Sequence, residues 1–171
     1  MQNPVRRPHL SAINMSDVAR WFAVLVQPRH EIKVLRNLSA RGLDEFVPLC
    51  RVRHQWSERV KMLRLPIFSG YVFCRFGRQE HRLVVDDPSV WSVARDSRAQ
   101  ITISDADIDA LKMLSASELK LCIHEYVEDG EIIVIDQGHL SGMQVFAVEN
   151  NGVVEFIKSF HSFRQSVICG V

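Results

Sequence analysis

Residues 50–64 hold the densest group of side chains able to bind another molecule. Positive charges recur along this stretch, with an indole and an imidazole among them. Guanidinium and ammonium groups neutralise phosphates whatever the base sequence, and an aromatic ring stacks on an unpaired base. The pattern therefore predicts a nucleic-acid-binding segment. Its candidate residues are Arg51, Arg53, His54, Trp56, Arg59 and Lys61.

A solvated basic loop, with Trp56 folded back on a sheet, explains the same composition equally well. Glu58 opposes phosphate binding locally, and it is placed to pair with Arg59 or Lys61 instead. Apolar residues alternate with polar ones in this stretch, which is typical of strands. The segment is therefore expected to be a projecting hairpin or a long loop.

The flanking segments predict a domain that positions this stretch. The continuous apolar run of residues 21–26 is typical of a central strand buried on both faces. Ile32, Leu35 and Leu38 recur at helical spacing, and Gly42 is placed to end that helix. Further strands are expected at 46–49, 71–76 and 90–94, with helices at 79–85 and, after a capping Ser104, at 104–114.

This order predicts an α+β fold with helices packed on a mostly antiparallel sheet. Short β-type runs then follow at 131–135, 143–148, 153–157 and 165–169, and Asn151-Gly152 is a strong hairpin signal. They predict a small C-terminal β-barrel. The expected organisation is a flexible tail (1–19), a first domain (20–114), a linker (115–124) and the barrel (125–171).

Net charge divides the chain in two. Residues 1–82 contain 15 Lys and Arg against 6 Asp and Glu, a net +9, whereas residues 83–171 contain 6 against 14, a net −8. A basic N-terminal part is suited to approach nucleic acid, which would repel the acidic part. Attraction between the two charge sets within one fold is the other interpretation.

Catalytic, metal-binding and targeting signals are missing from the sequence. It has no G-x-S-x-G, P-loop or G-x-G-x-x-G motif, so we expect no enzyme and no cofactor. The first residues of a predicted helix include Asp105, Asp107 and Asp109. The positive end of the helix dipole stabilises carboxylates at this position. No secretory signal or membrane span is recognisable, which favours a cytoplasmic protein without membrane contact. The four cysteines are far apart and predict free thiols with no metal: Cys50, Cys74, Cys122 and Cys169.

Three segments in order resemble the NusG family of transcription elongation factors. Residues 21–24 with 28–31 are similar to the opening strand and helix start of its N-terminal NGN domain. Residues 65–73 resemble the family's L-P-L-F-P-G-Y-V-F signature, with Ser69 replacing a proline. Residues 128–143 resemble a KOW motif, with Glu131, Ile132 and His139 departing from the usual residues.

The resemblance implies an NGN-type antiparallel sheet flanked by helices, followed by a small KOW-type β-barrel. It also implies a surface that docks on the clamp helices of the largest subunits of RNA polymerase. The matching residues are Phe68 and Tyr71, with Ile67 and Trp21 as weaker candidates. Aromatic anchors dominate such interfaces, so we expect these rings to be exposed in the free protein. Trp21 and Tyr71 are alternatively ordinary core residues.

Residues 55–59 resemble the W-S-D-R segment of specialised NusG paralogues that act on selected operons. For these the resemblance implies contact between the hairpin and the non-template DNA strand of the transcription bubble. The implied function is elongation or antitermination, by modulation of pausing and termination. A ribosomal protein or a termination factor is the partner implied for the KOW domain, which is poor in Lys and Arg.

Two other hypotheses remain open. KOW barrels also occur in ribosomal proteins, so a stand-alone RNA- or ribosome-binding module is possible, although the acidic residues 83–171 argue against it. The second alternative is an autoinhibited paralogue, in which the C-terminal domain covers the polymerase-binding surface. The opposite charges of the two halves are compatible with such contact.

Overall fold

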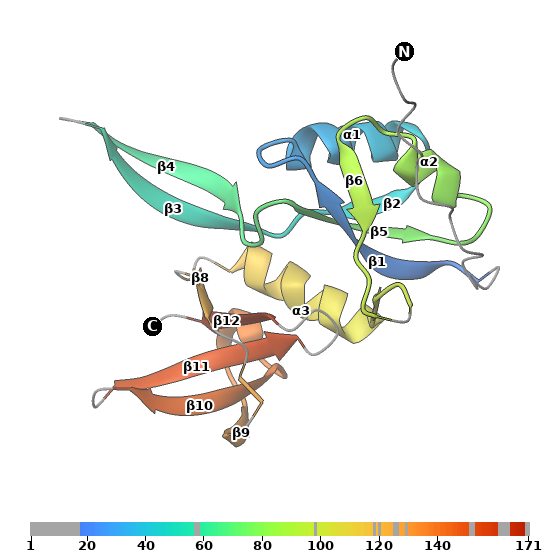
Figure 1. The fold of residues 1–171 in the computed structure, drawn as a ribbon. Helices are drawn as coiled ribbons and strands as arrows, with labels where there is room; N and C mark the ends of the chain where they lie inside the picture. Colours follow the sequence, from blue (N-terminus) through green and yellow to red (C-terminus); the bar gives the residue numbers. More distant parts are fainter. Residues whose placement is uncertain are drawn as a thin grey trace, which may run out of the picture.

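The computed structural model describes residues 18–56, 59–97, 99–117, 119, 121–124, 127–128, 130–150, 153–160 and 165–169. Within these residues the chain forms two five-stranded antiparallel sheets, a two-stranded hairpin and three α-helices. Figure 1 shows the two sheets one above the other, with α3 between them and the hairpin projecting to one side. The predicted mixture of helices and antiparallel sheets is confirmed.

The first sheet is built around β1 (Arg20–Val26), the apolar run that the sequence predicts as a central strand. Its neighbours follow the order β2-β5-β1-β6, and β7 also pairs with β1. Both faces of β1 are covered, which is why its sequence lacks polar alternation. The other strands are β2 (Asp44–Phe46), β5 (Tyr71–Phe76), β6 (Val90–Val93) and β7 (Thr102–Ile103).

Two helices cover one face of the first sheet. They are α1 (Glu31–Ala40) and α2 (His81–Val85), and both lie on the same side of it in Figure 1. Successive strand residues point to opposite faces, so Phe22 joins the core on this side together with Leu38 and Val84. This core contains only residues from the first sheet and its connections.

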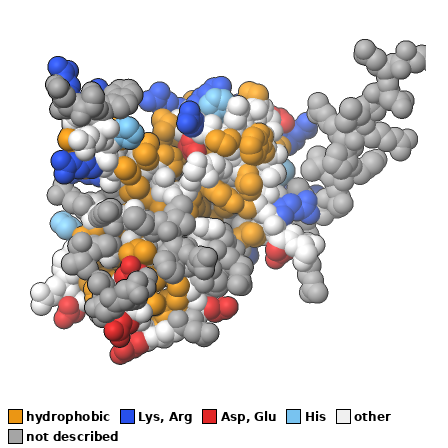
Figure 2. All heavy atoms as spheres, turned by 60° about the vertical axis from the view of Figure 1, so that its left-hand side comes forward, with side chains coloured by type: hydrophobic (Ala, Val, Ile, Leu, Met, Phe, Trp, Pro, Cys, Tyr) orange, Lys and Arg blue, Asp and Glu red, His pale blue; other side chains and the backbone are white. Residues whose placement is uncertain are grey.

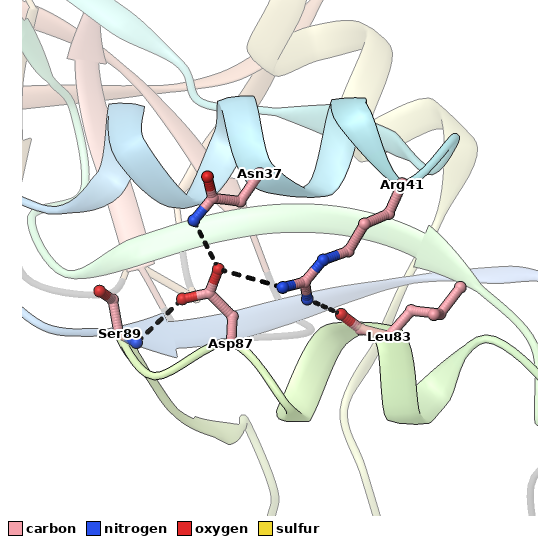
Figure 3. A network of polar contacts seen from close by, with 5 residues as sticks. All are labelled: Asn37, Arg41, Leu83, Asp87 and Ser89. Carbon is pink, nitrogen blue, oxygen red and sulfur yellow. Dashed lines mark hydrogen bonds and ion pairs between the residues drawn. The ribbon is translucent and has the colours of Figure 1, made fainter.

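A buried carboxylate ties α1 to the segment after α2 (Figure 3). Asp87 is 1% exposed and accepts hydrogen bonds from Asn37 Nδ2 at 2.7 Å and the Ser89 amide at 2.9 Å. Arg41 forms an ion pair with the same carboxylate and donates a hydrogen bond to the Leu83 carbonyl. A buried carboxylate without such partners would destabilise the fold, and here the partners fix both helices to one corner.

The opposite face of the first sheet receives α3 (Asp105–Ala116). The predicted cap is confirmed, because the Asp107 amide donates to Ser104 Oγ at 3.0 Å. Leu111 and Leu114 are completely buried in a second core, which also contains residues of the C-terminal sheet. This helix therefore packs against both sheets.

The predicted hairpin is confirmed as β3 (Leu49–Trp56) and β4 (Arg59–Pro66), a sheet of its own. The side chain of Ser115 links the hairpin base to α3. The Leu49 amide donates to Ser115 Oγ at 3.0 Å, and the Ser115 hydroxyl donates to the Leu49 carbonyl at 3.0 Å. The position of the hairpin base is therefore linked to α3.

The C-terminal sheet has the strand order β8-β12-β11-β10-β9. This order is an open path, and no pairing between β8 and β9 is present among the described residues, so closure into the predicted barrel is not shown. Buried hydroxyls of Ser159 and Ser166 reach the Val127 backbone. The elements are β8 (Leu121–His124), β9 (Glu131–Val134), η1 (Gly138–Leu140), β10 (Gln144–Asn150), β11 (Val153–Phe160) and β12 (Gln165–Cys169).

Two predicted segments differ from the structure. Residues 46–49 are not one strand, because β2 ends at Phe46 and β3 begins at Leu49, on either side of Pro48. The segment expected as a linker, 115–124, contains the end of α3 and the whole of β8. Most of the predicted tail and the Asn151-Gly152 turn lie outside the described residues.

Candidate functional site

The turn before β5 is held in place by a buried carboxylate. Glu31, in the first turn of α1, is 4% exposed and accepts a hydrogen bond from the Gly70 amide at 2.7 Å. The Gly70 carbonyl accepts from the Val26 amide at 2.9 Å, and the Ile67 amide donates to Pro48 at 2.8 Å. Gly70 has a φ of +81°, which favours glycine. These bonds fix the position of the side chains on the turn.

The ring of Phe68 lies between the two sheets. It makes edge-on contacts with Phe73 of the first sheet and Phe160 of the C-terminal sheet, with ring centroids 6.2 Å and 6.3 Å apart. Such T-shaped pairs contribute about 0.5–1.5 kcal/mol each beyond the area that they bury. Phe68 is therefore packed against side chains from both sheets.

Trp21 of β1 belongs to the same core as Phe68, but its partners are on α3. Its Nε1 donates to Asp105 Oδ1 at 3.1 Å, and the Lys112 ammonium is 5.8 Å from the ring centroid. With 7% exposure, Trp21 belongs to the core beneath α3. The alternative of an ordinary core residue describes this side chain in the observed state.

The expectation that the candidate patch is exposed in the free protein is wrong for three of its four residues. Trp21, Ile67 and Phe68 are 7%, 5% and 4% exposed, and Tyr71 is half-buried. Each packs in or against a core that also contains Leu140 and Phe160 of the C-terminal part, among others. The physical reason is burial of apolar surface by α3 over Trp21 and by the second sheet over Phe68, which a local sequence pattern cannot anticipate.

The six nucleic-acid candidates do not share one face of the hairpin. Residues that pair directly across an antiparallel hairpin share a face, and successive residues alternate. The register pairs Arg51 with Arg64 and Arg53 with Met62 on one face. On the other face it pairs His54 with Lys61 and Trp56 with Arg59. The side chain of Trp56 and the whole of Glu58 lie outside the described residues.

The charge division of the sequence is visible on the surface. In Figure 2, Lys and Arg side chains lie mainly over the upper part of the molecule, and carboxylates gather in the lower part around the C-terminal sheet. A band of hydrophobic side chains lies between them. Opposite charges on the two parts favour their contact, and the buried apolar residues of the shared core contribute more because they are removed from water.

Sequence reasoning missed the residues that position the turn and cover it. The sequence pattern predicts Glu31 as a charged residue outside the apolar face of its helix and Ser115 as a linker residue, and it does not mark Phe160. Glu31 carried a weak signal, since it is the one acidic residue of its helix. Nothing in the local pattern marked Ser115 or Phe160, whose partners are distant in sequence.

Burial keeps two cysteines protonated. It raises the pKa of the Cys74 thiol to about 12, with Glu45 and Asp44 adding to the effect. It also raises the pKa of Cys169 to about 11, against a lowering contribution from Lys158.

The described residues contain no group of three or more potential metal ligands among His, Cys, Asp and Glu. They include no helix that is long and apolar enough to cross a membrane.

Comparisons with known proteins give one family. Residues 19–112 match the family model described as "Transcription termination factor nusG". The fold is similar to a structure described as "Domain interaction in Thermotoga maritima NusG", with a TM-score of 0.54 and 18% identity over 90% of this chain and 94% of that one. An MjSpt4:Spt5 complex matches with a TM-score of 0.34 and 14% identity, over 88% and 99% of the two chains. No curated protein matches.

The matched first sheet and the overall likeness define a transcription factor with a NusG-like fold. The chain belongs to the NusG family, as its sequence motifs suggested. Proteins of this family are transcription factors.

Proposed function

We propose that this protein is an elongation or antitermination factor that docks on the clamp helices of RNA polymerase. The docking surface is the turn and the sheet face bearing Phe68, Tyr71 and Ile67, whereas Trp21 stays beneath α3 as a core residue. The observation that carries the proposal is the construction of the turn: Glu31 and the surrounding backbone fix it from behind. A rigid aromatic anchor loses little entropy on binding.

We further propose that the observed arrangement is the autoinhibited state. The C-terminal sheet covers Phe68 through Phe160, so polymerase binding requires the two sheets to separate. A protein with a small population of the open state has an apparent affinity reduced by that population. Polymerase binding shifts the population toward the open state, and the bound protein holds the clamp closed over DNA and disfavours pausing.

The contact between Phe68 and Phe160 allows a test with opposite outcomes for two neighbouring rings. Phe68→Ala removes a docking anchor and should weaken polymerase binding by about 30-fold or more. Phe160→Ala weakens only the cover and should tighten apparent binding, by up to about tenfold. The measurement is titration of labelled full-length protein with core polymerase, after circular dichroism has confirmed that both variants fold.

Equal loss of binding by the two variants would contradict the cover, and retained binding by Phe68→Ala would contradict the patch. The functional readout is a single-round transcription assay, in which added protein should shorten pauses. A lengthened pause would reverse the proposed direction of the effect.

The hairpin is proposed to contact the non-template DNA strand through its basic residues. Since they lie on two faces, substitution of one face at a time identifies the one that binds. Arg51→Ala with Arg53→Ala tests one face, and Arg59→Ala with Lys61→Ala tests the other. The face in contact should lose crosslinking to single-stranded DNA in the bubble, with a shallower salt dependence.

The C-terminal part, 125–171, is proposed to be a KOW-type domain, with 20–114 as the NGN-type domain. After the KOW-type domain is released from the first sheet, its proposed partner is a ribosomal protein or a termination factor. The alternative is a stand-alone RNA- or ribosome-binding module, which the acidic C-terminal composition disfavours. Pull-down with polymerase and co-sedimentation with ribosomes separate the two functions. We also propose that the protein acts in the cytoplasm, together with its proposed partners.

A further inference from the structure

One face of the hairpin is apolar near its base. The register pairs Cys50 with Leu65 and Val52 with Leu63, so these four side chains share a face. Leu63 and Leu65 are 38% and 43% exposed, and Val52 is half-buried. We call this set the proximal stripe. Exposed leucines are individually common, but two on one face of a projecting hairpin form a contiguous surface.

The proximal stripe continues the face that bears Phe68. Cys50 packs against the core that contains Ile67 and Phe68, whereas Leu49, on the other face, packs against the core beneath α1. The hydrogen bonds between Leu49 and Ser115 hold the base of the hairpin in this orientation. The stripe and the turn therefore form one surface, in which the part around Phe68 is covered by the C-terminal sheet while Leu63 and Leu65 are exposed.

The occupant of the covered part indicates the chemistry that the exposed part accepts. The C-terminal sheet presents apolar side chains, Phe160 among them, and residues 121–171 carry 7 Asp and Glu against 2 Lys and Arg. Beyond the stripe, the same hairpin face carries Lys61 and Arg59. A partner that fits the whole surface is thus apolar where it meets the leucines and acidic beyond them.

We propose that the proximal stripe is the exposed end of the docking surface for RNA polymerase, and that polymerase contacts it before the C-terminal sheet leaves. The proposal rests on the proposed function. The occupant is an apolar protein segment flanked by carboxylates, because a phosphate backbone gains nothing from Val52, Leu63 and Leu65. Contact at the stripe supplies binding free energy while Phe68 is still covered, which lowers the barrier to displacement of the cover.

The hairpin offers a matched control for the test. The stripe variant is Leu63→Ser with Leu65→Ser. The control is Val60→Ser with Met62→Ser, whose side chains are 46% and 61% exposed and lie on the opposite face of the same strand. Both variants remove two exposed apolar side chains from β4, so a general effect on the hairpin appears in both. Circular dichroism and thermal melting compare their folding.

The experiment measures the association rate of labelled full-length protein with core polymerase by stopped-flow fluorescence. We expect the stripe variant to associate about tenfold more slowly than the wild type, and the control within about twofold of it. Equal rates for the two variants overturn the inference. So does a stripe variant that loses crosslinking to single-stranded DNA while its association with polymerase is unchanged. Failure of the wild type to bind polymerase would instead overturn the proposed function, and this inference with it.

Discussion

The two faces of the first sheet are buried in different ways. Phe22 and Val24 of β1 pack beneath α1 and α2, in a core whose members all lie between residues 22 and 93. Trp21 and Ala23, the alternate residues of the same strand, pack in a core whose members extend to Cys169. One face is closed by segments adjacent in sequence, and the other by α3 together with the far end of the chain.

This difference separates structural burial from burial that can be exchanged. Asp87 and its partners secure the first face with buried polar bonds (Figure 3), which must be satisfied in every folded state. Phe68 and Phe160 meet across the second face through ring contacts, which another apolar surface can replace. A sheet with one permanent and one replaceable cover is suited to hide a binding site.

The largest effect is expected from the core beneath α1. Leu38 is completely buried there, so Leu38→Ala should lower the free energy of unfolding by about 2–5 kcal/mol through lost burial and a cavity. Urea denaturation measures the change. Arg36→Ala, exposed on the same helix, is the control and should stay within about 0.5 kcal/mol. An equally small effect of Leu38→Ala would contradict the structural role of this face.

Loss of the buried carboxylate should have a somewhat smaller effect. Asp87→Ala leaves the Asn37 amide and the Ser89 backbone without their acceptor, which costs about 1–3 kcal/mol. Thermal or urea unfolding gives the value, and the exposed neighbour Asp86, changed to Ala, is the control. Phe160→Ala is expected to tighten polymerase binding. If the first face is closed permanently, Asp87→Ala should not have this effect. A higher affinity of Asp87→Ala for polymerase would mean that the first face also opens.

Thiol reactivity compares the two faces directly. Cys74 lies in the core beneath α1, and Cys169 lies in the shared core, where it lines a cavity of about 620 Å³. In single-cysteine variants at pH 8, we expect Cys169 to react with a disulfide reagent at least about tenfold faster, because its pKa is about 11 rather than about 12 and because the proposed opening would expose it. Equal rates would contradict a more mobile second face.

The pH dependence of these rates follows from the raised pKa values. The thiolate is the reactive form, and both thiols are protonated well above neutral pH, with pKa values of about 12 and 11. Both rates should therefore rise about tenfold per pH unit between pH 7 and 9. A plateau near pH 8 in either variant would mean that the folded state does not hold the pKa of that thiol so high.

Local periodicity predicted the first face, and it could not predict the second. The apolar run of β1, the spacing of Leu38 in α1 and the alternation of the hairpin depend on neighbours in sequence, so the elements were found. The position of Phe68 on a turn predicts that it is exposed, because a turn is usually at the surface. Its cover, Phe160, is 92 residues away in a strand that carries no signal of what it packs against.

Strand boundaries failed for a related reason. Pro48 interrupts the chain between β2 and β3, and only the pairing of Leu49 with Pro66 shows that a new sheet begins there. Likewise, residues 121–124 form a strand because β12 pairs with them, with Leu121 opposite Cys169. Pairing over such distances depends on the tertiary structure more than on intrinsic propensity.

The smallest predicted effect concerns the helix that both sheets share. Ser104 caps α3, because its hydroxyl accepts a hydrogen bond from the Asp107 amide. Ser104→Ala should therefore lower the free energy of unfolding by about 1 kcal/mol, within a range of about 0.5–2. Ser39→Ala, exposed on α1, is the control, with an expected change below about 0.5 kcal/mol. Because α3 carries part of the replaceable face, hydrogen exchange of the amides in its first turn should accelerate. Exchange that accelerates in α1 instead would mean that the two faces are not independent.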